Sequence, residues 1–254
     1  AITALLISFF IGPKIIRTLT FHQIGETIRK NGPESHLKKE GTPTMGGIIV
    51  LLAIILPTIL WSKLNNEYII LILISTTWMG MIGFLDDYLK IIKKYSKGLI
   101  ARYKLFGQIG LGLFISIAIH NMSTISDYST FISIPFIANG MLNIGWLYTP
   151  LTIIVITGTS NAVNLTDGLD GLATGLIAIA SLAFAAIAYA SGRIDFSNYL
   201  NILYIPNSGE LFIFCLSLAG ASIGFLWFNA NPAKIFMGDT GSLSLGAALG
   251  TIAV

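Results

Sequence analysis

Long apolar stretches alternate with short polar ones along the whole chain. A helix that crosses the hydrocarbon core of a bilayer needs about 20 predominantly apolar residues. The pattern predicts eight membrane spans, in whole or in part, at residues 1–19, 45–61, 69–85, 105–120, 142–157, 172–190, 211–228 and from 242 onward. We therefore predict an all-α fold, a polytopic transmembrane helix bundle of about eight helices.

Both ends of the chain fall inside apolar runs. The first run, residues 1–12, and the last, from residue 242 to Val254, are each too short to span a bilayer alone. We expect residues 1–254 to form a single integral-membrane domain that is truncated at both ends.

Composition narrows the class of protein further. Of the 254 residues, 54% are hydrophobic and only 11% are charged, against about a quarter in a typical soluble domain. The mean hydropathy is +0.78. These values exclude a disordered chain, a protein that coats nucleic acid and an ordinary soluble enzyme. The single cysteine, Cys215, cannot form an internal disulfide.

The position of the charges predicts the orientation. The net charge is only +3, but 13 of the 15 basic residues fall at the end of the first span or in the connections after the first, third, fifth and seventh spans. The positive-inside rule makes that side cytoplasmic. Eight of the 12 acidic residues share it. This mixture suits a metal ion and a polyanionic substrate, although basic loops occur on inner-membrane proteins of every function.

Two adjacent carboxylates, Asp86 and Asp87, end the third span. Carboxylates at a membrane boundary are costly unless they are paired or bound to a cation. Adjacent residues on a helix point about 100° apart, so one could face a site while the other stands behind it. The alternative is a pair of solvated acids, which the dipole at a helix C-terminus disfavours.

A second polar segment covers residues 161–173. Asn161 and Asn164 are three residues apart, as are Asp167 and Asp170, and this spacing puts each pair on one helical face. Gly168 allows backbone to approach a ligand closely. Capping of the next helix, by Thr166 or Asp167, is the simpler interpretation. It would explain one aspartate but not two aspartates and two asparagines.

The last connection brings a third acidic position, Asp239, just before the final span. It could be a helix N-cap. It could also be a hard oxygen ligand on the same side as Asp86 and Asp167, which suggests Mg²⁺. No Cys/His cluster suggests zinc. Phe236 could stack on a base or anchor the loop at the membrane interface.

The first connection, residues 38–47, is basic and then rich in glycine. Gly41, Pro43 and the Gly46–Gly47 pair predict a tight turn into the second helix. Lys38 or Lys39 could neutralise phosphate, or the loop could simply be solvated.

Together these motifs resemble a known family. The segments are GTPTMGG at 41–47, DDYLK at 86–90, NAVNLTDGLDGLA at 161–173, GFLWFN at 224–229 and FMGDTGS at 236–242. In order and spacing they resemble the bacterial phospho-N-acetylmuramoyl-pentapeptide transferases, which belong to the polyprenyl-phosphate N-acetylhexosamine-1-phosphate transferases. The resemblance covers nearly the whole chain, and the run at 161–173 is its most specific part.

The resemblance implies an enzyme of the bacterial cytoplasmic (inner) membrane with ten transmembrane helices and a site that faces the cytoplasm. Such an enzyme uses Mg²⁺ to transfer phospho-MurNAc-pentapeptide from UDP-MurNAc-pentapeptide to undecaprenyl phosphate, giving lipid I and UMP. It leaves the oligomeric state open, a homodimer included. The family also carries a His-rich cytoplasmic motif that these 254 residues lack.

The resemblance also implies roles for individual residues. Asp86, Asp87 and Asp239 would be catalytic, and Asp239, Asp86 and Asp167 would hold the metal. The positions implied for substrate binding are Lys39, Thr44, Lys90, Asn161, Asn164, Asp167, Gly168, Leu169, Asp170, Asn229 and Phe236.

Three other interpretations remain open. A sister enzyme that uses UDP-GlcNAc would share the metal site and differ in sugar specificity. A transporter or channel would place its polar groups near mid-membrane, often on broken helices. A structural scaffold would not need five acids on one face.

Overall fold

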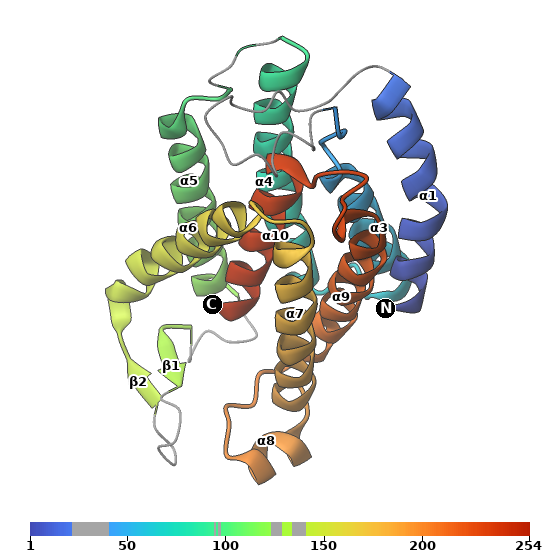
Figure 1. The fold of residues 1–254 in the computed structure, drawn as a ribbon. Coiled ribbons are helices and arrows are strands. Elements are labelled where there is room, and N and C mark those ends of the chain that lie inside the picture. The colour runs from blue at the N-terminus through green and yellow to red at the C-terminus, as the bar shows by residue number, and fades with distance from the viewer. Residues whose placement is uncertain (22–40, 94, 96–97, 123–128, 134–140) are drawn as a thin grey trace.

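The protein is a helix bundle in the computed structural model, which describes residues 1–21, 41–93, 95, 98–122, 129–133 and 141–254 (Figure 1). The helices are α1 (Ile2–Phe21), α3 (Gly47–Trp61), α4 (Glu67–Ile91), α5 (Ala101–His120), α6 (Tyr148–Thr166), α7 (Leu172–Ser191), α8 (Ile194–Leu200), α9 (Leu211–Asn229) and α10 (Gly238–Ala253). Short 3₁₀ turns, Gly145–Leu147 and Ser208–Glu210, lead into α6 and α9.

The predicted all-α membrane bundle is confirmed. Each predicted span overlaps a helix, and five helical segments in the described part of the chain are long and apolar enough to cross a bilayer. They are α1, α4, α5, α7 and the segment Ser208–Asn229, which contains α9. The shorter α3 is also apolar. The protein is therefore a multi-pass membrane protein.

Helix α10 lies in the middle of the bundle, between α4 and α6 and against the N-terminal end of α3 (Figure 1). Every residue from Thr240 to Gly250 is buried. Most of them are Gly, Ala or Ser, which let helices approach closely inside a membrane. A Cβ added at Gly246 would lie 2.6 Å from the Cα of Ser160 on α6. This close packing fixes the position of α10.

Two apolar clusters fill the bundle on either side of α10. One, around Phe214 and Phe225, joins α1, α3 and α9. The other, around Met79 and Ile115, joins α4, α5 and α6. Large apolar side chains such as Phe10 and Ile154 are exposed on the outside, as lipid-facing residues are.

Several predicted boundaries move. The fifth span was predicted at residues 142–157, but α6 covers Tyr148–Thr166, and Met141–Asn143 is instead a strand, β2. It pairs antiparallel with β1, Phe131–Ser133, and Ile132 lies opposite Leu142. Helix α4 continues to Ile91, so Asp86 and Asp87 lie within a helix rather than at its end.

The alternative in which Thr166 or Asp167 caps α7 is wrong. Its N-cap is Gly171, with φ +76°. The Thr166 hydroxyl donates instead to the carbonyl of Ala162 within α6. Asp167 follows the last residue of α6. Because Gly171 occupies the left-handed region, a glycine rather than a polar cap makes the turn.

Candidate metal centre

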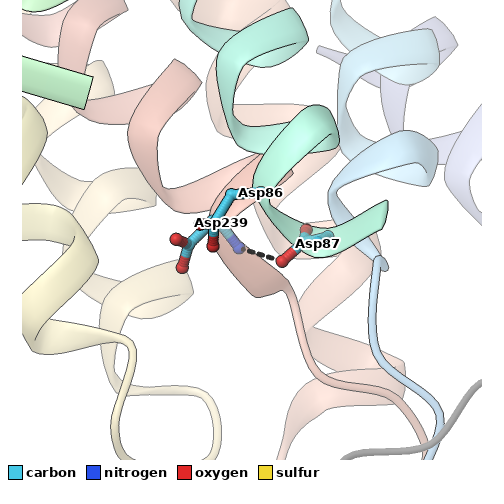
Figure 2. A group of neighbouring side chains, drawn as sticks. All are labelled: Asp86, Asp87 and Asp239. Atoms are coloured by element: carbon cyan, nitrogen blue, oxygen red, sulfur yellow. Dashed lines mark hydrogen bonds between the residues drawn. The ribbon is translucent and has the colours of Figure 1, made fainter. Parts of the chain in front are cut away.

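Three aspartates from two distant parts of the sequence meet where α4 lies against the start of α10. Figure 2 shows Asp86 and Asp87 on α4 beside Asp239, which lies in the first turn of α10. Each carboxylate can offer one oxygen, and the three oxygens lie within 4.8 Å of one another. Asp86 is fully buried and Asp87 is 4% exposed. Buried carboxylates need partners of opposite charge or hydrogen-bond donors.

Glycines bring the start of α10 into this position. A Cβ added at Gly83 of α4 would lie 2.1 Å from the carbonyl oxygen of Asp239, and one added at Gly47 of α3 would lie 2.1 Å from the nitrogen of Gly241. Real Cβ atoms do not approach so closely, so any side chain at either position would push α10 away. The absence of side chains at Gly47 and Gly83 therefore allows α10 and Asp239 to lie this close to α3 and α4.

Asp87 binds the N-terminal turn of α10. Its Oδ1 accepts a hydrogen bond from the Asp239 backbone nitrogen at 3.1 Å, drawn dashed in Figure 2. Its Oδ2 accepts from the backbone nitrogen and the hydroxyl of Thr240, at 2.9 and 2.6 Å. The first N–H groups of a helix have no partner within the helix and favour an anion. Asp87 satisfies two of them.

Asp86 and Asp239 share two ammonium groups. Lys90, one turn after Asp86 on α4, forms ion pairs with both carboxylates, and its Nζ lies 3.3 Å from Oδ2 of Asp239. Lys104 on α5 also pairs with both, and its Nζ lies 3.1 Å from Oδ1 of Asp86. The Leu99 backbone nitrogen donates to the same Asp86 oxygen at 2.7 Å.

Asn164 on α6 fixes the other side of Asp239. Its amide nitrogen donates to Oδ1 of Asp239 at 2.9 Å and to the hydroxyl of Ser242 at 2.8 Å. One turn earlier, the Asn161 amide donates to Oε1 of Gln108 at 2.9 Å. Gln108 is buried on α5. The predicted asparagine pair thus faces α5 and α10, as the three-residue spacing requires.

The remaining predicted residues lie on the turn between α6 and α7. Asp167 is not a member of the group of three carboxylates. Gly168 and Leu169 are exposed. Oδ2 of Asp170 accepts from the Ala233 backbone nitrogen at 3.3 Å, so it ties this turn to the connection between α9 and α10. Their roles toward a metal or a substrate stay predictions.

Asn229, at the end of α9, is buried and bonded within the protein. Its oxygen accepts from the Gly171 backbone nitrogen at 3.0 Å and from the Thr174 hydroxyl at 2.9 Å. Its amide donates to the carbonyl of Ile235 at 3.0 Å. These contacts join α7, α9 and the connection to α10.

The connection to α10 is also bonded to the glycine-rich turn before α3. The Phe236 backbone nitrogen donates to the carbonyl of Pro43, and the Phe236 carbonyl accepts from Gly46, both at 2.8 Å. The Phe236 side chain is partly buried and Thr44 is buried. Lys39 lies outside the described residues.

Sequence reasoning missed two residues of this centre. Lys104 was counted only among the basic residues of its side of the membrane, and Thr240 was given no role. A lysine in the first turn of an apolar helix is the one local signal that could have drawn attention to Lys104. Nothing in the sequence marks Thr240.

The donor set suits a hard divalent cation. Carboxylate oxygens are the ligands that Mg²⁺ prefers, usually one or two from the protein. Both ammonium groups, those of Lys90 and Lys104, already lie where the carboxylates of Asp86 and Asp239 converge. The charge of these carboxylates is therefore compatible with a divalent cation as well as with the two lysines.

Comparison with known families agrees with the site. The model of glycosyl transferase family 4 matches residues 69–254. Signature 1 of the phospho-N-acetylmuramoyl-pentapeptide-transferases matches residues 39–51. Residues 69–254 include all three carboxylates, Lys90 and Lys104.

Similar proteins cover the whole chain. Proteins named phospho-N-acetylmuramoyl-pentapeptide-transferase are 51% identical in Desulforapulum autotrophicum, 50% in Desulfotalea psychrophila and 49% in Thermodesulfovibrio yellowstonii. Each match spans 100% of this chain and 70% of the relative. The fold, the site and the matched domain define a membrane-embedded glycosyl-1-phosphate transferase. Within that class, the chain belongs to the phospho-N-acetylmuramoyl-pentapeptide-transferase family.

Proposed function

We propose that this protein transfers phospho-MurNAc-pentapeptide from UDP-MurNAc-pentapeptide to undecaprenyl phosphate, in a Mg²⁺-dependent reaction on the cytoplasmic side of the bacterial inner membrane. The products are lipid I and UMP. The observation that carries the proposal is the convergence of Asp86 and Asp239 with two lysines inside an apolar bundle. Such a site suits a metal ion and a pyrophosphate together. The names of the similar proteins supply the substrate class.

The reaction exchanges one phosphorus–oxygen bond for another. An oxygen of the lipid phosphate attacks the phosphorus that carries the sugar, and the bond from that phosphorus to the oxygen of UMP breaks. The electron pair leaves with UMP. A phosphate monoester with a second pKa of about 6 is mostly dianionic near pH 7. No strong base is therefore needed to activate the acceptor.

Asp239 and Asp86 would hold the cation. Mg²⁺ supplies charge neutralisation and orientation of the pyrophosphate when it is bound. Asn164 keeps the Asp239 carboxylate in place through its 2.9 Å hydrogen bond. With a cation held there, the ammonium groups of Lys90 and Lys104 would be available to donate to phosphate oxygens.

The other predicted residues would bind substrate around this centre. Gly168, Leu169 and Asp170 form the turn beside it, and Phe236 and Thr44 lie in the two connections that pack together. We propose that these segments hold the nucleotide. Lys39 and Asp167 stay with this proposal as candidate contacts to phosphate and to metal.

The test is a transfer assay with purified full-length protein in detergent micelles. Labelled UDP-MurNAc-pentapeptide and undecaprenyl phosphate should yield labelled lipid and an equal amount of UMP, and EDTA should stop both. Asp239→Asn should reduce the rate by at least two orders of magnitude. UDP-GlcNAc is the matched control donor and should give no lipid product. Turnover of the Asp239→Asn variant at the wild-type rate, or preference for UDP-GlcNAc, would refute the proposal.

A further inference from the structure

The two adjacent aspartates of α4 have different partners in the structure. We propose that Asp87 is a positioning residue: it holds the first turn of α10 so that the Asp239 carboxylate faces Asp86, and it does not itself bind the metal or the lipid phosphate. This inference rests on the proposed function for its kinetic consequences. Its structural content can be tested without any substrate.

The contacts of Asp87 are directed at the first turn of α10. A carboxylate has about four acceptor positions, and Asp87 uses three of them for the Asp239 nitrogen, the Thr240 nitrogen and the Thr240 hydroxyl. Charge-assisted hydrogen bonds of this kind are about twice as strong as neutral ones.

Asp86 is equally buried but has different partners. Its oxygens face Lys90, Lys104 and the Leu99 backbone nitrogen. The two lysines are side chains that a bound cation can replace. The N–H groups around Asp87 belong to the backbone, which cannot withdraw without unwinding the turn. The division of roles between the two carboxylates follows from this contrast.

Position is the property that Asp87 controls. Because Gly83 and Gly47 have no side chains, α10 can lie close to α4 and α3. The absence of a side chain permits this contact but does not stabilise it. The hydrogen bonds of Asp87 stabilise the contact between α4 and α10. Gly238, with φ +74°, lies against the same carboxylate, since a Cβ there would lie 2.7 Å from Oδ2. Asp239 is the next residue, so its direction depends on this attachment.

Hydrogen–deuterium exchange of the substrate-free full-length protein tests the attachment directly. Loss of the charged acceptor in Asp87→Asn should make the backbone amides of residues 239 and 240 exchange on the order of tenfold faster, because each loses a hydrogen bond to a charged group. Asp86→Asn is the matched control, adjacent and equally buried, and should leave these amides unchanged. Wild-type exchange in Asp87→Asn would overturn the proposal.

The Mg²⁺ dependence of UMP release tests the consequence. Thr240→Val removes one of the three donors to Asp87 and leaves every acid in place. Both Asp87→Asn and Thr240→Val should raise the Mg²⁺ concentration for half-maximal rate several-fold, and the double variant should show less than the product of the two effects, because both act on one contact. A catalytic base at Asp87 predicts the opposite: collapse of kcat in Asp87→Asn with normal Mg²⁺ dependence, and near-wild-type behaviour of Thr240→Val.

The two assays separate the two proposals. If Asp87→Asn does not fold, exchange and Mg²⁺ dependence of Thr240→Val still decide the question, and wild-type values in both would overturn the inference. If the wild-type protein releases no UMP, the proposed function fails, while the exchange result still decides whether Asp87 holds α10.

Discussion

At the scale of single residues, Lys104 belongs to the site although its sequence context did not predict this. It pairs with both Asp86 and Asp239, so it competes with any cation for the two carboxylates. In Lys104→Met we expect half-saturation at several-fold lower Mg²⁺, since a competing charge is gone, and a fall of at least tenfold in kcat, since a phosphate donor is gone. Steady-state UMP release measures both. Lys93→Met removes an exposed lysine and should change neither. Unchanged kcat in Lys104→Met would contradict a role in transfer.

Asn229 gives a second prediction at this scale. Replacement by alanine would leave the Gly171 N–H, the Thr174 hydroxyl and the Ile235 carbonyl without their partner. We expect Asn229→Ala to lower the free energy of unfolding by about 2 kcal/mol or more, even without nucleotide. Asn198→Ala, at an exposed position on α8, should change it by less than about 0.5 kcal/mol. Denaturation in detergent compares the two. A purely substrate-binding asparagine would leave the apo protein as stable as wild type.

The sequence predicts which acidic residues belong to the site, but it does not predict the different role of each. A carboxylate inside an apolar run is expensive, so Asp86, Asp87 and Asp239 stand out wherever they lie. Which of two neighbours faces the ligand depends on what packs against each, and the start of α10 lies more than 140 positions away in sequence. Lys104 and Thr240 could not be predicted from the sequence, because lysines at helix ends and threonines in helices are common without any role in a site.

At the scale of helices, the close contact between α10 and Gly83 predicts that a side chain at this position lowers the stability of the protein. A methyl group there would overlap the Asp239 carbonyl. We expect Gly83→Ala to lower the free energy of unfolding by about 1–3 kcal/mol, because overpacking strains α4 and α10, and to reduce transfer with it. Gly175→Ala is the matched helical control, since nothing lies within 4 Å of the added Cβ. It should be neutral or slightly stabilising. Equal effects of the two substitutions would contradict the close-packing argument.

Hydropathy located the helices well because lipid exposure demands apolar length, and it placed their ends poorly because ends depend on contacts. The apolar residues Met141 and Leu142 belong to a strand, since they pair with Phe131–Ser133. The polar second half of α6 stays helical, since Ser160 donates to the Leu243 carbonyl and Asn164 to Asp239 on α10. The mean hydropathy of a sequence window contains no information about either of these contacts.

At the scale of the whole molecule, the distribution of basic residues predicts which end of the bundle faces the cytoplasm. Leu169 and Tyr199 are exposed and flank α7, whose 20 residues rise about 30 Å, so they lie on opposite sides of the membrane in our assignment. Cysteine is introduced at one position at a time in the full-length protein, and native Cys215 is buried and should stay unlabelled. A membrane-impermeant maleimide applied to spheroplasts should label Tyr199→Cys and spare Leu169→Cys. Inside-out vesicles should reverse the result. The opposite pattern would put the carboxylates outside, away from any cytoplasmic nucleotide sugar, so orientation and proposed substrate would fail together.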